Sequence, residues 1–252
     1  MKRRTNPLLL AILLVLGCAT TPGPDRLRIL VYNIHAGRDV SGANNMQRVA
    51  DLISSTRADV VLLQEVDRRT TRSGGIDHLS ELERLTRMNS VFGKAINFQG
   101  GEYGIAILSR WPIITSETIA LSGSPAEARV ALMAETNGLH IVNTHFDASQ
   151  DDRHRLEEAG HLLEEIERFG RKPLVIGGDF NSDPDSKVYA QLRDSGLRDA
   201  FAECGGTNGL TYPADTPVKR IDYLFLTAPF RCVAVDVPSS QASDHRAVFV
   251  EI

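Results

Sequence analysis

The sequence predicts an α/β fold in which two β-sheets carry helices on their outer sides. The first observation is the strand, helix, strand order of residues 27–34, 46–55 and 59–66, which is typical of a crossover unit in a buried sheet. The second is a series of short strand-like segments in the middle of the chain. The third is the return of helix and strand patterns from residue 151 onward.

The spacing of apolar residues predicts the helices and strands of the first half of the chain. Residues 27–34 alternate and are rich in β-forming residues, residues 46–55 place apolar side chains on one helical face, and residues 59–66 form an apolar strand. A second helix is predicted over residues 76–88. Gly, Pro or Asn turns then separate five segments that predict a β-meander: residues 90–98, 103–109, 112–121, 128–136 and 139–145.

The second half begins with the longest helical pattern, residues 151–169, whose leucines recur at helical spacing. An apolar strand follows at residues 174–176. A short helix is predicted at residues 186–194 and a loop at residues 205–209. Three final strands are predicted at residues 221–226, 233–237 and 247–252. Because the sequence has no repeat and no internal linker, residues 27–252 are expected to form one domain.

Residues 173–184, with the sequence PLVIGGDFNSDP, turn a buried strand abruptly into a group of polar residues. Gly177 and Gly178 let the backbone bend there or approach another group closely. Asp179 and Asn181 are two residues apart on extended backbone, so their side chains point the same way and can hold one water or phosphate. Taken alone, the segment also fits an ordinary turn. The rest of the chain favours a site.

The N-terminus carries the pattern of an export signal, with three basic residues before an apolar run that is too short to span a bilayer. The end of that run, LVLGC, resembles a bacterial lipobox. This resemblance implies a signal peptide at residues 1–17, a lipid-modified Cys18 and a tether over residues 18–26. The alternative is an ordinary cleaved signal with an incidental cysteine. We expect an exported protein anchored through Cys18 to the bacterial cell envelope, at the outer membrane facing the periplasm.

Composition and charge are those of an ordinary globular protein, with 42% hydrophobic residues and a formal net charge of −4. Removing the signal, which carries Lys2, Arg3 and Arg4, makes the charge three units more negative. An acidic chain is a poor candidate for binding nucleic acid through phosphate contacts, so nucleic acid is not favoured as a partner. Cys204 and Cys232 either pair in a disulfide, which an exported protein can keep, or are small buried residues that never meet.

Polar residues repeatedly lie at the ends of the predicted strands, which suggests one shared cleft at one edge of the sheets. They are Asn33, His35, Glu65, Tyr103, His145, Asp179, Asn181, Asp222, Asp244 and His245. The set is rich in oxygen ligands and has no cysteine, which suits Mg²⁺ or Mn²⁺ better than structural zinc. The loop at residues 67–75 adds Arg68, Arg69 and Arg72. A solvated loop is the favoured interpretation of each, and the alternative is that one of them reaches a substrate phosphate, because the loop directly follows Glu65.

Seven short motifs occur in order along the chain: YNIHAG (32–37), LLQEVD (62–67), YGIAILSR (103–110), NTHFD (143–147), GGDFNS (177–182), IDYLF (221–225) and SDHRAV (243–248). Together they resemble the endonuclease/exonuclease/phosphatase superfamily, whose members cut phosphodiester or phosphomonoester bonds with a divalent metal. The resemblance spans nearly all of residues 27–252. It implies a four-layer α/β/β/α sandwich of two mixed β-sheets flanked by helices.

The resemblance also implies a metal site. Glu65 is expected to hold the metal, with Asn33 beside it and Asp244 contributing. Mg²⁺ is the expected ion and Mn²⁺ the alternative. Many nucleases of the family carry an acidic residue where this chain has His35, which weakens the case for a further ligand from that strand.

By the same resemblance, six residues have catalytic roles. Asp179 would orient or deprotonate the attacking water, and Asn181 would fix its position and contact phosphate. His245 would contact or protonate a phosphate oxygen, while Asp222 orients its ring and favours its charged form. The two further phosphate donors are His145 and Tyr103.

These expectations describe a metal-dependent phosphoric ester hydrolase that acts by in-line attack of water. The acidic charge and the membrane tether favour a small or lipid-derived phosphate ester as the partner, and a monomeric protein is expected. The alternatives are an exported nuclease acting on DNA and a surface lipoprotein that uses the fold for binding without catalysis. The intact set of water-activating residues argues against the binding module.

Overall fold

A computed structural model describes residues 26–121, 127–170, 172–207 and 209–252. The helices are α1 (Met46–Thr56), α2 (His78–Thr86), α3 (Arg153–Arg168), α4 (Lys187–Asp194) and α5 (Ala200–Glu203), with a 3₁₀ turn at His35–Gly37. The strands are β1 (Arg28–Asn33), β2 (Val60–Arg68), β3 (Asn89–Phe98), β4 (Gly101–Ser109), β5 (Ile113–Leu121), β6 (Arg129–Thr136), β7 (Leu139–His145), β8 (Leu174–Asp179), β9 (Arg198–Asp199), β10 (Asp222–Leu226), β11 (Ala234–Asp236) and β12 (Val248–Glu251). The predicted helices and strands are all present, and β9 and α5 are additions to them.

The strands form two six-stranded sheets, in the orders β11-β12-β1-β2-β4-β3 and β5-β6-β7-β8-β10-β9. Both sheets are mixed. In the first, β1 and β2 are parallel, and in the second β7 and β8 are parallel, while the flanking pairs are antiparallel. The prediction of one β-meander is wrong, because β3 and β4 belong to the first sheet and β5, β6 and β7 to the second. Local turn signals look the same whether the next strand pairs with the last one or crosses to a facing sheet.

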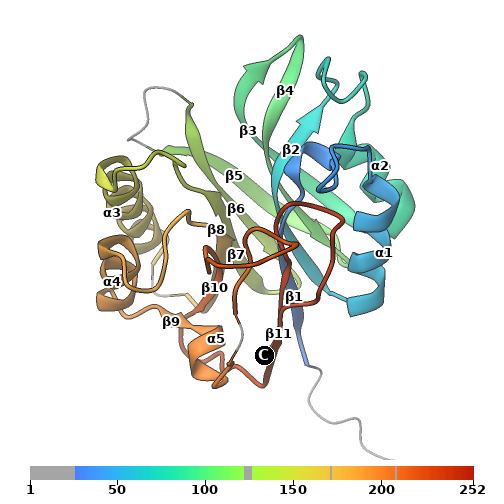
Figure 1. Ribbon diagram of the computed structural model, residues 1–252. Helices are drawn as coiled ribbons and strands as arrows, with labels where there is room; N and C mark the ends of the chain where they lie inside the picture. The colour runs from blue at the N-terminus through green and yellow to red at the C-terminus, as the bar shows by residue number, and fades with distance from the viewer. Residues whose placement is uncertain (1–25, 122–126, 171, 208) are drawn as a thin grey trace, which may run out of the picture.

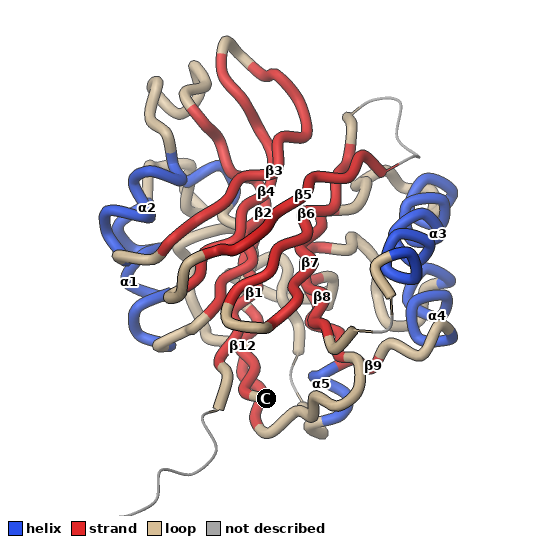
Figure 2. The backbone as a smooth tube through the Cα atoms, turned by 180° about the vertical axis from the view of Figure 1, so that it is seen from behind, coloured by secondary structure: helices blue, strands red, loops and turns tan. Residues whose placement is uncertain are grey.

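The two sheets pack face to face, with α1 and α2 outside the first and α3 and α4 outside the second (Figures 1 and 2). Alternation along β1 shows why. Ile29 and Val31 lie in the core between the sheets, whereas Leu30 and Tyr32 lie in the core beneath α1 and α2. A third core lies between the second sheet and the helices α3 and α4, which pack on it. The fold is therefore the four-layer α/β/β/α sandwich.

A buried polar bridge joins the two sheets. Gln64 of β2 donates from Nε2 to Asn143 Oδ1 of β7 at 2.7 Å. Asn143 in turn donates from Nδ2 to the backbone oxygens of Leu63 and Ala106, both at 2.9 Å. Both side chains are fully buried, where hydrogen bonds are strong and misalignment is costly. The bridge therefore ties β2 and β4 to β7 just below the strand ends.

Cys204 and Cys232 form a disulfide, with their Cα atoms 5.6 Å apart. The structure thus decides between the two alternatives that the sequence left open. The predicted signal peptide at residues 1–17 and the lipidation site Cys18 lie outside the described residues. Within the part of the chain that the structure describes, no helix is both long enough and apolar enough to cross a membrane.

The glycines of β8 permit two close approaches. A Cβ on Gly177 would lie 2.6 Å from Leu62 and 2.8 Å from Val31, both on the facing sheet. A Cβ on Gly178, which has φ of +155°, would lie 2.0 Å from the carbonyl oxygen of Thr144 in the neighbouring strand β7. The glycine pair therefore lets β8 lie close to both β7 and the opposite sheet, as the sequence suggested.

We expect the Gly178→Ala substitution to lower the free energy of unfolding by about 2 kcal/mol or more, because the new methyl group meets backbone that cannot move aside. Urea denaturation measures the change. Gly160→Ala in α3 is the matched control, because its nearest neighbour lies at 3.5 Å and alanine is favoured over glycine within a helix by about 1 kcal/mol. Equal effects from the two substitutions would contradict this account of Gly178.

Candidate active site

The predicted site residues meet at one edge of the two sheets. Parallel strands end there with Asn33 of β1, His145 of β7 and Asp179 of β8. Antiparallel strands begin at the same edge, so Asp222 of β10 lies directly opposite Asp179. One cavity of about 890 Å³ opens at this edge. The predicted residues that line it are Glu65, Tyr103, His145, Asp179, Asn181, Asp244 and His245, while Asn33 and Asp222 are buried beside them.

A bulge in β2 places Glu65 in the wall of the cavity. The register between β2 and β4 shifts between Leu63 and Val66, and Glu65 has φ of +58°. Bulges re-aim a side chain, and a left-handed non-glycine residue stores strain that is common at functional sites. His35 and Asn181 also have positive φ, at +47° and +48°. Three residues at the site therefore hold backbone conformations that only the surrounding fold enforces.

Asn33 connects Glu65 to Asp179. Its Nδ2 donates to Glu65 Oε1 at 3.2 Å and to Asp179 Oδ2 at 3.0 Å, while its Oδ1 accepts from the His35 backbone N–H at 3.0 Å. The nitrogen faces two carboxylates and the oxygen faces an N–H, so the orientation of the amide is consistent with all three partners. Asn33 thus positions Glu65, and its role as a direct metal ligand stays a prediction.

Asp179 is a buried carboxylate surrounded by donors. It is 1% exposed, and its Oδ1 accepts from the Asn181 backbone N–H at 2.9 Å. Its Oδ2 lies 3.6 Å from His145 Nε2 and 3.7 Å from His245 Nε2. Burial, followed by repulsion from Asp222, raises the pKa of Asp179 to about 7. A carboxylate with such a pKa is suited to accepting a proton near neutral pH.

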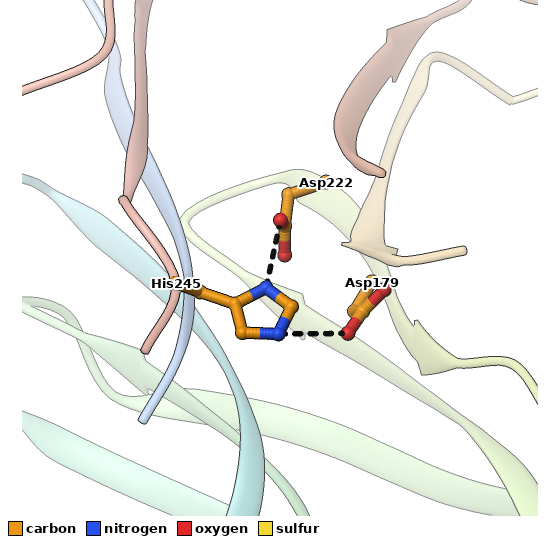
Figure 3. A group of neighbouring side chains, drawn as sticks. All are labelled: Asp179, Asp222 and His245. Atoms are coloured by element: carbon orange, nitrogen blue, oxygen red, sulfur yellow. Dashed lines mark hydrogen bonds and ion pairs between the residues drawn. The ribbon is translucent and has the colours of Figure 1, made fainter. Parts of the chain in front are cut away.

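His245 is held as an imidazolium by two carboxylates (Figure 3). Its Nδ1 lies 3.0 Å from Asp222 Oδ2, and its Nε2 faces Asp179. Burial alone would lower the pKa of His245, but Asp222 and then Asp179 outweigh that effect and raise it to about 10. The ring also packs against Tyr212, with 4.8 Å between ring centroids. His245 is therefore a fixed positive charge beside Asp179.

His145, in contrast, is neutral, and Arg129 determines its tautomer. Arg129 Nη1 lies 3.3 Å from His145 Nδ1. Because arginine only donates, Nδ1 must accept and the ring proton must reside on Nε2, which faces Asp179. Burial first, then the charges of Arg129 and His245, hold the pKa of His145 well below its usual range. His145 is therefore a neutral donor aimed into the site.

Two groups of side chains compete for the role of metal site. Asp179, Asp222 and His245 place one ligand atom each within 4.8 Å of one another. However, His245 carries protons on both nitrogens when charged, so it has no lone pair for a metal. The half-buried carboxylates of Glu65 and Asp244 offer the oxygen ligands that Mg²⁺ and Mn²⁺ prefer.

The donor set around Asp244 fits a cation. His35 Nδ1 is buried without a hydrogen-bond partner among the described residues, and it lies 3.7 Å from Asp244 Oδ1. Ser243 Oγ donates to the Asn33 backbone oxygen at 2.7 Å, which fixes the loop that carries Asp244 against β1. Glu65 and Asp244 thus remain the predicted ligands, and the assignment of this metal is a prediction.

Sequence reasoning missed several residues of the cavity wall. They are Arg129, Glu127, Arg155, Asp152, Tyr212 and Lys219. Arg129 begins β6 and Arg155 lies in α3, where each looks like an ordinary charged residue of a strand or helix. The loop at residues 67–75 did carry a signal, and the structure selects Arg72 as the arginine that lines the cavity.

This chain is similar to known proteins over most of its length. The sequence profile of the Endonuclease/Exonuclease/phosphatase family matches residues 30–245. The uncharacterized protein YbhP of Escherichia coli strain K12 is 23% identical over 243 residues, which covers 89% of this chain and 95% of that protein.

Solved structures show the same fold. The endonuclease/exonuclease/phosphatase from Bacteroides vulgatus superposes with a TM-score of 0.77 and 20% identity, covering 90% of this chain and 98% of that chain. The mannosyl-6-phosphatase from Bacteroides thetaiotaomicron has a TM-score of 0.75 and 18% identity, covering 90% and 99%. This chain therefore belongs to the endonuclease/exonuclease/phosphatase family, whose members are generally metal-dependent hydrolases of phosphoesters.

Proposed function

We propose that this protein is a divalent-metal-dependent phosphoesterase that hydrolyses a phosphodiester or phosphomonoester bond by in-line attack of water. The observation that carries the proposal is Asp179, buried between a neutral His145 and a charged His245 at one cavity. A binding module without catalysis has no need of a proton acceptor held in this way. The site therefore favours an enzyme.

Asp179 is the group that takes a proton from the attacking water. Asn33 donates to Oδ2 and the Asn181 backbone N–H donates to Oδ1, so the carboxylate is held in place and each oxygen keeps acceptor capacity for a water in the cavity. His245 brings a positive charge to a phosphoryl oxygen, and His145 donates its Nε2–H to another. Tyr103 is buried, and burial followed by the Glu65 charge raises its pKa, so its hydroxyl stays a donor.

Glu65 and Asp244 are the residues that would hold the metal, with Asn33 orienting Glu65. A bound Mg²⁺ or Mn²⁺ would supply positive charge that polarises the phosphoryl group. The chain itself contributes the carboxylates of Glu65 and Asp244 in the cavity wall. The half-buried state of Glu65 and Asp244 leaves them open to the cavity.

The cavity suits a small substrate. Its volume of about 890 Å³ lies within the usual range of small-molecule sites, roughly 300–1,000 Å³. Its walls combine acids with the basic residues Arg72, Arg129, Arg155 and Lys219, a mixture that suits hydroxyl and phosphate groups together. The acidic net charge disfavours a nucleic-acid backbone as substrate.

We also propose an exported monomer that is lipid-anchored at Cys18, after removal of residues 1–17, in the outer membrane facing the periplasm. The disulfide supports an oxidising compartment. β1 begins at Arg28 and ends at Asn33 in the site, and six residues of strand span about 20 Å. A tether before Arg28 would join the domain at the end of β1 away from the cavity. This attachment leaves room at the cavity for a dissolved phosphate ester, such as a released headgroup.

The first expected outcome is metal-dependent turnover of a small phosphate ester. The purified protein would be assayed on an inositol phosphate, a sugar phosphate, phospholipid vesicles and duplex DNA, each with Mg²⁺ and with EDTA. We expect turnover of a soluble ester that EDTA stops, that Mg²⁺ restores, and that His245→Ala lowers by about 100-fold. Preferred cleavage of DNA would instead support the nuclease, and no turnover of any substrate would support the binding module.

Asp222→Asn should lower kcat by about 100-fold and change KM much less, because the imidazolium of His245 loses its main partner while the cavity wall stays intact. Steady-state kinetics on the best substrate measures both constants. The matched control is Asp59→Asn, which also alters a buried, hydrogen-bonded carboxylate but lies away from the cavity. A change confined to KM would contradict the orienting role of Asp222.

The plot of the hydrolysis rate against pH should be bell-shaped. Asp179 acts deprotonated, so activity rises as the pH passes upward through about 7. His245 acts protonated, so activity falls as the pH passes through about 10. The logarithm of kcat/KM against pH measures both limbs. In Asp222→Asn the alkaline limb should move to lower pH, and an unmoved limb would assign it to another group.

A further inference from the structure

Arg72 is set apart from the other arginines of its loop, residues 67–75. Arg68 and Arg69 form ion pairs with Asp77 at 3.0 and 3.8 Å, outside the cavity. Arg72 lines the cavity together with Glu65 and Tyr103. Its position is therefore that of a residue that faces substrate.

The Arg72 guanidinium is held in one orientation. Its Nε and Nη2 donate to the two oxygens of Asp67 at 2.7 and 2.8 Å. Asp67 is fully buried and also accepts from Thr70 Oγ1 at 2.7 Å. The carboxylate occupies one edge of the guanidinium fork. Nη1 has no hydrogen-bond partner in the described part of the chain, so the donors of the outer edge remain available.

Aromatic rings and the backbone complete this support. The guanidinium carbon lies 4.7 Å from the Phe98 ring centroid and 5.2 Å from that of Tyr103. The Arg72 backbone N–H donates to Gln99 Oε1 at 2.9 Å, which ties the loop to the tip of the β3–β4 hairpin. Half-buried Ile96 and Phe98 extend the same wall as an apolar shelf. Arg72 is thus preorganised before any ligand arrives.

A role as counter-ion to Asp67 accounts for only one edge of the fork. A buried ion pair that served stability alone can be replaced by apolar residues at little or no cost. Asp67 is better explained as the group that aims Arg72. We propose that Arg72 binds a second anionic group of the substrate, separate from the phosphate that reacts. This inference rests on the proposed function, because it assumes that the reacting phosphate occupies the site of Asp179 and His245.

The ligand at Arg72 is a phosphate or carboxylate, because two parallel N–H donors match two oxygens of such a group. The substrate class follows: a phosphate ester whose alcohol part carries another phosphate or a carboxylate. The apolar shelf of Ile96 and Phe98 would then contact the carbon atoms between the two anionic groups.

The test compares binding of matched probes by titration calorimetry. One pair is fructose 1,6-bisphosphate and fructose 6-phosphate, and the other is 3-phosphoglycerate and glycerol 3-phosphate, so two spacings between anions are covered. All titrations use the Asp179→Asn background, which prevents turnover by the proposed mechanism. Asp67→Asn/Arg72→Gln removes both charges together, so no buried charge is left unpaired. Arg69→Gln is the control, because that arginine is exposed in the same loop.

In at least one pair we expect the two-anion probe to bind at least tenfold more tightly than its partner. Asp67→Asn/Arg72→Gln should abolish this preference and change the Kd of the one-anion probe by less than twofold, while Arg69→Gln leaves the preference intact. A preference that is absent, or that survives the loss of Arg72, overturns the proposal. So does equal weakening of both probes, which would place Arg72 at the reacting phosphate.

Two further measurements keep the outcome decisive. If thermal melting shows that the double variant is unfolded, Arg72→Lys decides, because lysine keeps the charge but lacks the fork; the preference should fall at least threefold, and an unchanged preference overturns the proposal. Turnover of the protein with Asp179 intact is measured separately. An Arg72-dependent preference without turnover would refute the proposed hydrolase and leave the second anion site standing.

Discussion

The site depends on keeping the negative charge of Asp179 out of water. A carboxylate that is 1% exposed needs hydrogen bonds and nearby polar groups from distant parts of the chain. Asn33 of β1 and Asn181 after β8 donate to it, and the rings of His145 from β7 and His245 from the loop before β12 lie 3.6 and 3.7 Å away. The two sheets must therefore meet with their strand ends aligned. The buried bridge between Gln64 and Asn143 sets that alignment.

The charges around Asp179 divide the two histidines into different roles. His245 lies between Asp222 and Asp179, which favours the imidazolium, whereas burial and then the guanidinium of Arg129 keep His145 neutral. Environment alone separates two side chains of the same type, one as a fixed cation and the other as a neutral donor. Such divergence of protonation states is typical of sites that run acid and base chemistry together.

Much of the sandwich could be predicted from the sequence, because it follows from local patterns. Alternation along β1 sends Ile29 toward one core and Leu30 toward another, and helical periods identify the segments that cover the outer faces. The polar residues at strand ends also pointed to one edge of the sheets. The sheet to which each middle strand belongs could not be predicted, because both arrangements satisfy the same turns and the same alternation.

The sequence by itself determined the four layers, the strand ends and the acids and histidines at those ends, but not the whole cavity wall. Tertiary structure decided the rest: that Arg72 faces the cavity while its neighbours pair with Asp77, that Arg129 fixes the tautomer of His145, and that Cys204 meets Cys232. The physical reason is the same in each case. Protonation, pairing and orientation depend on burial and on partners far away in the chain, which exist only once the two sheets have packed.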